Sequence, residues 1–124
     1  QLRQIHRGKT GALINAAVQM GAAAAGADAD ICQVLEQYAY GIGLVFQIVD
    51  DVLDVTSSAE QLGKPIGSDG DNGKTTFAVL YGPEQAMELA HSINQETCDA
   101  LIKALGPKAE FLAELADRLL VRKN

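Results

Sequence analysis

Residues 43–54 read Gly43-Leu44-Val45-Phe46-Gln47-Ile48-Val49-Asp50-Asp51-Val52-Leu53-Asp54, a run that places three carboxylates among apolar side chains. On a strand these carboxylates would scatter to both faces, whereas helical spacing of three and four residues lets all three share one side with Gln47. The rest of such a helix is apolar and is predicted to be largely buried: Leu44, Val45, Ile48, Val52 and Leu53. The stretch therefore predicts a central helix with an acidic side.

Three like charges packed against an apolar core are costly unless a cation compensates them. Mg²⁺ prefers carboxylate oxygens and keeps several waters, which leaves room for a phosphate group of a substrate. The motif is therefore compatible with a platform for Mg²⁺ and a phosphorylated ligand, although the residues alone favour the plainer alternative. Because the motif is short, the alternative is an acidic helix end that faces solvent.

Size and charge exclude several classes of protein. The 124 residues are 48% apolar, enough for one domain with a core but not for two. The formal net charge of -6 argues against a nucleic-acid-binding protein, which would normally present a basic face. No apolar run is long enough to span a bilayer. Cys32 and Cys98 lack metal-ligand spacing, so we expect reduced thiols and a cytoplasmic location.

The first half of the chain is predicted to be helical. Residues 1–26 are rich in Ala, and the glycines around Lys9 and Thr10 predict a bend that turns backbone carbonyls toward a ligand. Asp30 and Gln33 resemble a capping box, which predicts a second helix over residues 31–56.

A glycine-rich segment, residues 57–74, is predicted to be a loop that could close over an anionic ligand. Beyond it, residues 75–81 predict a short helix that Gly82 ends, and Pro83 suits the start of an amphipathic helix that Gly106 stops. A final helix is predicted to bury four apolar side chains: Phe111, Leu112, Leu115 and Leu119. The predicted fold class is all-α.

Four segments, in this order and spacing, resemble the C-terminal part of the trans-prenyl diphosphate synthases, and bacterial farnesyl diphosphate synthases (geranyltranstransferases) most of all. They are residues 6–14 (HRGKTGALI), 43–55 (GLVFQIVDDVLDV), 62–69 (LGKPIGSD) and 73–77 (GKTTF). The resemblance covers the whole chain. It implies that residues 1–124 are the C-terminal portion of a single isoprenoid-synthase-type helical bundle, which is usually homodimeric.

The resemblance also implies an activity, the head-to-tail condensation of isopentenyl diphosphate with an allylic diphosphate (dimethylallyl or geranyl diphosphate). It assigns Mg²⁺ binding to the second aspartate-rich motif, with Asp50 the most direct ligand. It further assigns diphosphate binding to two lysines and places a threonine and a glutamine near the reacting carbons. The implied residues are Asp50, Asp51 and Asp54 for the metal, Lys9 and Lys64 for the allylic diphosphate, and Thr10 and Gln47, which with Lys9 form the implied catalytic set.

One departure from the family pattern bears on function. The family uses a first aspartate-rich motif and a basic pocket for isopentenyl diphosphate, and these 124 residues contain neither. The chain also opens without Met, so we expect a fragment or a processed chain that is inactive alone. The alternative is a non-catalytic helical subunit or interaction module of the same fold.

Overall fold

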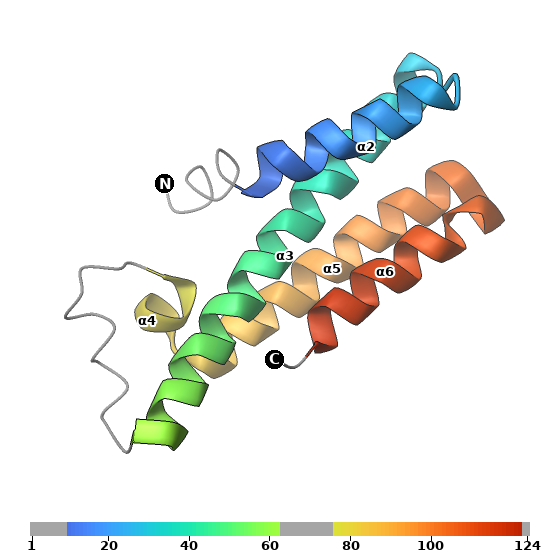
Figure 1. Ribbon diagram of the computed structural model, residues 1–124. Helices are drawn as coiled ribbons and strands as arrows, with labels where there is room; N and C mark the ends of the chain where they lie inside the picture. Colours follow the sequence, from blue (N-terminus) through green and yellow to red (C-terminus); the bar gives the residue numbers. More distant parts are fainter. Residues whose placement is uncertain (1–9, 63–75, 123–124) are drawn as a thin grey trace.

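The computed structural model describes residues 10–62 and 76–122, and every regular element in these two ranges is a helix (Figure 1). The predicted all-α class is therefore confirmed. The elements are α2 (Ala12–Ala24), α3 (Ala29–Leu62), α4 (Phe77–Tyr81), α5 (Pro83–Leu105), the 3₁₀ helix η4 (Gly106–Ala109) and α6 (Glu110–Val121).

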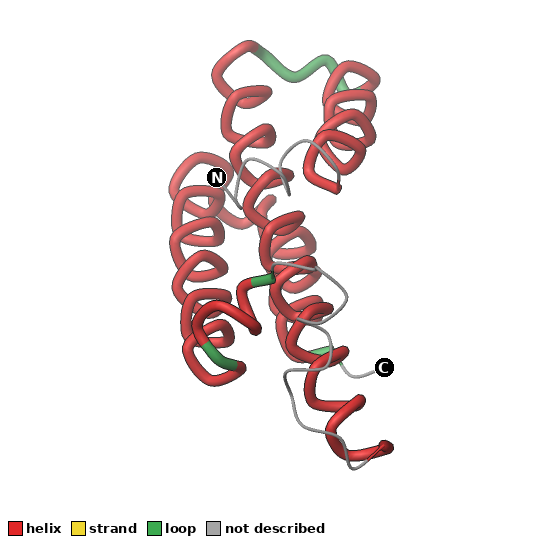
Figure 2. Tube along the Cα trace, turned by 90° about the vertical axis from the view of Figure 1, so that its left-hand side faces the viewer, coloured by secondary structure: helices red, strands yellow, loops and turns green. Residues whose placement is uncertain are grey.

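The long helix α3 is the element on which the others pack. It contacts α2, α4, α5 and α6, and its run through the length of the molecule is visible from two directions (Figures 1 and 2). Its buried side chains form the centre of the core, with Ile48 and Val45 almost fully enclosed. Val52 is buried as predicted, while Leu44 and Leu53 are partly buried at the edge of the same cluster. The predicted central helix is thus confirmed.

The ends of α3 differ from the predicted ones. The side chain of Asp28, rather than that of Asp30, caps the helix, because Asp28 Oδ1 accepts a hydrogen bond from the Ile31 amide at 2.9 Å. The helix therefore begins at Ala29. It continues to Leu62, six residues beyond the predicted end, so the first part of the predicted loop is helical. The rest of that loop lies outside the described residues.

Two glycines let neighbouring helices approach α3 closely. A Cβ atom on Gly43 would lie 3.1 Å from the Cα of Gly11, at the start of α2. A Cβ atom on Gly41 would lie 2.9 Å from Cγ2 of Thr97 on α5. Both distances are shorter than ordinary van der Waals contact, so these two positions hold α2 and α5 at their observed separation from α3.

The ends of α4 and α5 and the start of α5 lie where the sequence predicted, but α4 begins at Phe77 rather than at residue 75. Thr76 caps α4 by accepting a hydrogen bond from the Val79 amide at 3.1 Å. Gly82 ends α4 with φ at 85°, a conformation that favours glycine, and Pro83 occupies the first position of α5. Gly106, with φ at 60°, ends α5.

The burial predicted for α6 is partly wrong. Leu112 and Leu119 pack against the core, but Phe111 is 74% exposed and Leu115 is 37% exposed. Phe111 and Leu115 each come one residue before a side chain that packs on the core, Leu112 and Ala116. A step of one residue rotates a side chain by about 100° around the helix axis, which turns both residues away from the core. The small side chain of Ala116 takes the central buried position instead.

Candidate functional site

The structure brings Thr10 and Gln47 together across the contact between α2 and α3. Thr10 Oγ1 donates a hydrogen bond to Gln47 Oε1 at 3.0 Å, in a half-buried position. Thr10 and Gly11 adopt the wider π-helical conformation just before α2 begins. Such turns interrupt the regular hydrogen-bond ladder and often occur at functional sites. The bend predicted around Lys9 and Thr10 stays a prediction, because Lys9 and the residues before it lie outside the described residues.

The close approach at Gly43 is what allows this hydrogen bond. Gly43 lies one helical turn before Gln47 on the same side of α3, so the backbone of Gly11 rests directly on the helix beside the Thr10–Gln47 pair. Continuing at helical spacing, Asp50 and Asp54 follow on this side. The result is one polar row along α3 that runs from the start of α2 to the aspartate motif.

The three aspartates differ in their surroundings. The side chain of Asp50 is 48% exposed, Asp54 is exposed, and one carboxylate oxygen of Asp51 is buried. Asp51 is one residue from Asp50 and is therefore rotated from it by about 100° around α3. Within residues 10–62 and 76–122, no three His, Cys, Asp or Glu side chains are close enough to hold a metal ion together. The predicted convergence of all three aspartates is not seen, and their role in metal binding stays a prediction.

The donor chemistry still suits Mg²⁺. This ion is commonly held by one or two carboxylates, with waters and substrate phosphates completing its octahedron. Asp50 and Asp54 supply two exposed or half-exposed carboxylates one turn apart on α3. These residues therefore fit a Mg²⁺ ion that is also bound by groups from outside this helix.

Arg122, directly after α6, is a member of the site that the sequence analysis did not identify. One guanidinium nitrogen, Nη2, lies 3.3 Å from Asp50 Oδ1 and 3.3 Å from the carbonyl oxygen of Phe46. The guanidinium carbon lies 4.3 Å from the centre of the Phe46 ring, over its face. The Arg122 side chain is only 20% exposed. No local pattern could have indicated this contact, because 72 residues separate Arg122 from Asp50.

Two lysines were predicted to bind the diphosphate. Lys9 and Lys64 both lie outside the described residues. Their predicted roles, like those of Thr10 and Gln47 in catalysis, stay predictions.

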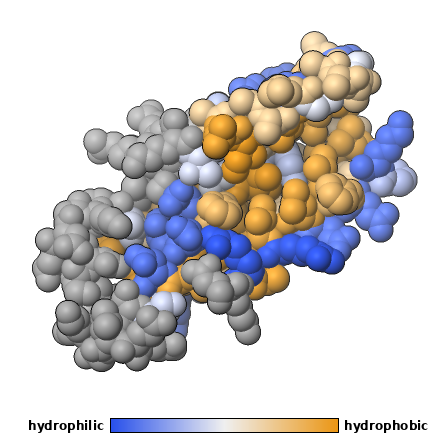
Figure 3. All heavy atoms as spheres, viewed as in Figure 1, coloured by the Kyte–Doolittle hydropathy of each residue, from blue (hydrophilic) through white to orange (hydrophobic). Residues whose placement is uncertain are grey.

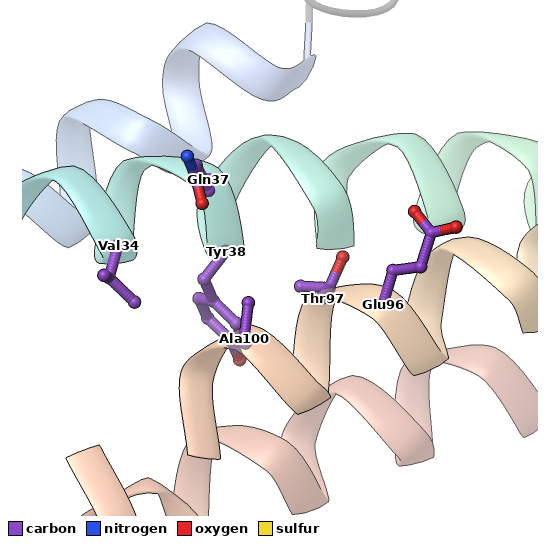
Figure 4. Close-up of a pocket in the computed structure, with 6 residues that line it drawn as sticks. All are labelled: Val34, Gln37, Tyr38, Glu96, Thr97 and Ala100. Carbon is purple, nitrogen blue, oxygen red and sulfur yellow. The ribbon is translucent and has the colours of Figure 1, made fainter. Parts of the chain in front are cut away.

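A separate pocket of about 210 Å³ opens between α3 and α5 (Figure 4). It lies on the side of α3 that faces α5, and none of the predicted site residues lines it. Its walls come from both helices: Val34, Gln37, Tyr38, Glu96, Thr97 and Ala100. Within it, the Tyr38 hydroxyl donates a hydrogen bond to the Leu112 carbonyl at 2.7 Å, which ties α3 to α6. Burial, with a smaller contribution from the Cys98 thiolate charge, raises the pKa of Tyr38 to about 12.

The two cysteines are both free thiols, as predicted. Cys98 is buried between α5 and α6, and Cys32 is half-buried at the start of α3. Burial and the nearby carboxylates of Asp117 and Asp99 raise the pKa of Cys98, so this thiol is poorly suited to act as a nucleophile.

Among the described helices, none is both long enough and apolar enough to cross a membrane.

Comparisons with known proteins agree with this architecture. The model of the family described as polyprenyl synthetase matches residues 1–109. A geranylgeranyl pyrophosphate synthase of Arabidopsis thaliana mitochondria (number 10) is 44% identical over 123 residues, which are 99% of this chain and 36% of that protein. The large subunit 1 of a heterodimeric geranylgeranyl pyrophosphate synthase from Arabidopsis chloroplasts is 39% identical over 123 residues, 99% of this chain and 33% of that protein.

A solved structure shares the fold. The crystal structure of a geranyltransferase from Helicobacter pylori 26695 superposes with a TM-score of 0.69 and 34% sequence identity, over 97% of this chain and 37% of that one. The chain therefore spans about a third of the length of the relatives that it matches.

Proposed function

Since the chain belongs to the polyprenyl synthetase family, we propose that it is the C-terminal portion of a prenyl diphosphate synthase. The proposed reaction is the Mg²⁺-dependent condensation of isopentenyl diphosphate with an allylic diphosphate, dimethylallyl or geranyl diphosphate. The observation that carries the proposal is the polar row on α3. It aligns the Thr10–Gln47 hydrogen bond with Asp50 and Asp54 on one side of the helix.

In this mechanism the row divides into two parts. Asp50 and Asp54, with Asp51 beside them, would hold Mg²⁺ at the diphosphate end. When bound, the ion supplies positive charge to the diphosphate as the carbon–oxygen bond of the allylic substrate ionises. Lys9 and Lys64 are proposed to bind the same diphosphate and to stabilise its growing charge electrostatically.

At the other end of the row, Thr10 and Gln47 are proposed to face the developing allylic cation. Their hydrogen bond orients the side-chain amide of Gln47, and the proposal is that this oriented amide lies beside the reacting carbons. Such preorganisation lowers the barrier because the dipoles need not reorient as charge develops. Isopentenyl diphosphate would be bound by residues outside this chain.

The rest of the domain is proposed to cover an apolar surface that this chain leaves open. Apolar side chains gather between α2 and α6 in the view of Figure 3, beside hydrophilic ones near the end of α6. Leu13 and Met20 on α2 are each 74% exposed, as is Phe111 on α6. Large exposed apolar areas indicate a contact surface. We propose that upstream helices of the same domain pack here, and that the complete protein is a homodimer.

The product and the location of the protein are also proposals. The resemblance of the sequence to farnesyl diphosphate synthases favours geranyl and farnesyl diphosphate as products. The relatives named geranylgeranyl pyrophosphate synthases add a third candidate product, which is one isoprene unit longer than farnesyl diphosphate. Two free thiols favour the cytoplasm, although the printed names of the plant relatives place those proteins in mitochondria or chloroplasts.

The test is an assay of labelled isopentenyl diphosphate incorporation into extractable prenyl product by the full-length protein. Asp50→Asn keeps the shape of the side chain and removes one ligand charge, so we expect kcat to fall by roughly 100-fold or more. Asp30→Asn is the matched control, because Asp30 lies exposed at the opposite end of α3. Equal turnover by Asp50→Asn and wild type would contradict the proposal. Chromatography of the product gives its chain length.

A second candidate is a non-catalytic helical subunit of the same fold. The observation behind a subunit role is the similarity to a protein named as the large subunit of a heterodimeric synthase. Residues 1–124 should be assayed alone and then mixed with the upstream part of the protein. We expect no turnover by the chain alone, since positioning of the second substrate can account for roughly 7–11 kcal/mol of a barrier. Activity on mixing supports a synthase portion, whereas persistent inactivity supports a subunit.

A further inference from the structure

The Arg122 side chain extends from the end of α6 to the aspartate motif. The backbone leaves the helix at Arg122 in an extended conformation, with φ at -61° and ψ at 151°. From there the guanidinium lies against α3, where Nη2 is shared between Asp50 Oδ1 and the Phe46 carbonyl. A positive charge thus rests on the carboxylate that is proposed to be the first ligand of Mg²⁺.

We propose that Arg122 is a built-in counter-ion of Asp50, and that a divalent cation competes with Arg122 for this carboxylate, so that binding of the metal releases the end of α6. This proposal rests on the proposed function, which makes Asp50 a metal ligand. It adds a coupling between the metal site and a helix that contributes no metal ligand of its own.

Electrostatic repulsion favours this competition. Asp50, Asp51 and Asp54 place three carboxylates within two turns of one helix, and like charges at this spacing repel one another. The guanidinium of Arg122 offsets part of this repulsion in the absence of metal. A divalent cation on the same carboxylate would add positive charge only a few ångströms from the guanidinium, so the two cations oppose each other.

The Nη2 contacts of Arg122 are long for an ion pair, although the guanidinium packs on the Phe46 ring and the side chain is 20% exposed. Both contacts of Nη2 are 3.3 Å long, whereas charge-assisted hydrogen bonds are usually about 2.7–2.9 Å long. On the exposed face of the same helix, Arg118 approaches Glu114 to 2.8 Å. The Phe46 carbonyl also lies inside α3, where it can accept the regular helical hydrogen bond, so it loses little when the guanidinium leaves.

The opposite interpretation is that Arg122 positions Asp50 for the metal and remains in place. It predicts weaker metal binding when Arg122 is replaced, whereas competition predicts tighter binding. The sign of the change in affinity therefore separates the two.

The experiment measures Mn²⁺ binding to the full-length protein by electron paramagnetic resonance, with Mn²⁺ in place of Mg²⁺ and without diphosphate. We expect Arg122→Gln to tighten Mn²⁺ binding by about two- to fivefold, the range that a partly exposed ion pair accounts for. Arg118→Gln is the matched control, because it removes the same charge from the same helix one turn earlier, where the side chain is 75% exposed. Unchanged or weaker binding by Arg122→Gln overturns the proposal.

Hydrogen exchange of the wild-type protein gives a test that needs no variant. We expect the amides in the last turn of α6, residues 119–122, to exchange faster with saturating Mg²⁺ than without it. Equal or slower exchange overturns the proposal. This test remains decisive if Arg122→Gln fails to fold.

Asp50→Asn separates this inference from the proposed function. If Asp50→Asn binds Mn²⁺ as well as wild type does, the proposed function fails. If it binds more weakly while Arg122→Gln is unchanged, only the competition fails. Competition also requires that adding Arg122→Gln to Asp50→Asn has no further effect on affinity.

Discussion

Replacement of Gly43 by Ala tests whether the contact between α2 and α3 sets the geometry of the candidate site. The new Cβ would lie 3.1 Å from the Cα and 3.4 Å from the amide nitrogen of Gly11, and 3.4 Å from Cδ1 of Ile14. The first two are backbone atoms, which cannot rotate away. Relief therefore requires α2 to move from α3 and to lengthen the Thr10–Gln47 hydrogen bond, which is now 3.0 Å.

Two opposing effects determine the magnitude. Alanine in place of glycine within a helix stabilises by about 1 kcal/mol. Overpacking of a close contact destabilises by about 1–3 kcal/mol. We therefore expect the free energy of unfolding of Gly43→Ala to change by between zero and a loss of about 2 kcal/mol. Gly21→Ala is the matched control, since nothing lies within 4 Å of its added Cβ, and it should gain up to about 1 kcal/mol.

Urea unfolding of the full-length protein, followed by circular dichroism, gives both free energies. The free energy of unfolding of Gly21→Ala should exceed that of Gly43→Ala by about 1–3 kcal/mol. If Gly43→Ala is stabilised as much as Gly21→Ala, the contact between Gly43 and Gly11 does not fix the separation of α2 and α3. Gly43→Ala should also lower kcat more than Gly21→Ala, because only the former disturbs Thr10 and Gln47.

Three further outcomes can be checked with the same unfolding assay. Asp28→Ala should cost about 1 kcal/mol because it removes the cap of α3, whereas Asp30→Ala should cost less than half as much. Thr10→Val should cost about 1 kcal/mol by removing the hydrogen bond to Gln47. Tyr38 has a pKa of about 12 in the folded protein and about 10 when unfolded. Its contribution to the free energy of unfolding is therefore complete below pH 10 and falls by about 1.4 kcal/mol per pH unit between pH 10 and 12. Tyr38→Phe should remove this part of the alkaline destabilisation.

Local patterns in the sequence predicted the local structure well. Apolar residues at helical spacing identified α3 as the central helix, and Gly82, Pro83 and Gly106 correctly marked the ends of α4 and α5. Such signals depend only on residues within one or two turns, so they can be read without knowledge of the fold. The start of α3 was misplaced by two residues because Asp28 and Asp30 are both suitable caps, and only the backbone geometry decides between them.

Burial on α6 shows where local patterns fail. Apolar residues at 111, 112, 115 and 119 are consistent with a buried stripe, but the position of the stripe depends on which neighbours α6 meets. In the described residues it faces α3 and α5 through Ala116 and Leu120, which leaves Phe111 exposed. Amphipathicity therefore predicted that α6 packs on the core, and the tertiary contacts determined which side chains do so.

The candidate site depends on contacts that no sequence window contains. Spacing along α3 placed Gln47, Asp50 and Asp54 on one side. The partner of Gln47 is 37 residues away in the sequence, and the partner of Asp50 is 72 residues away. Thr10 reaches Gln47 only because Gly43 admits the backbone of α2, and Arg122 reaches Asp50 only because α6 lies against α3 and ends beside it. A change that shortens or rotates the end of α6 should therefore alter the charge at Asp50 while α3 remains helical. The Arg122 guanidinium, together with Leu120, which is buried in the same cluster as Val49 and Val52, therefore links the C-terminal helix to the aspartate motif.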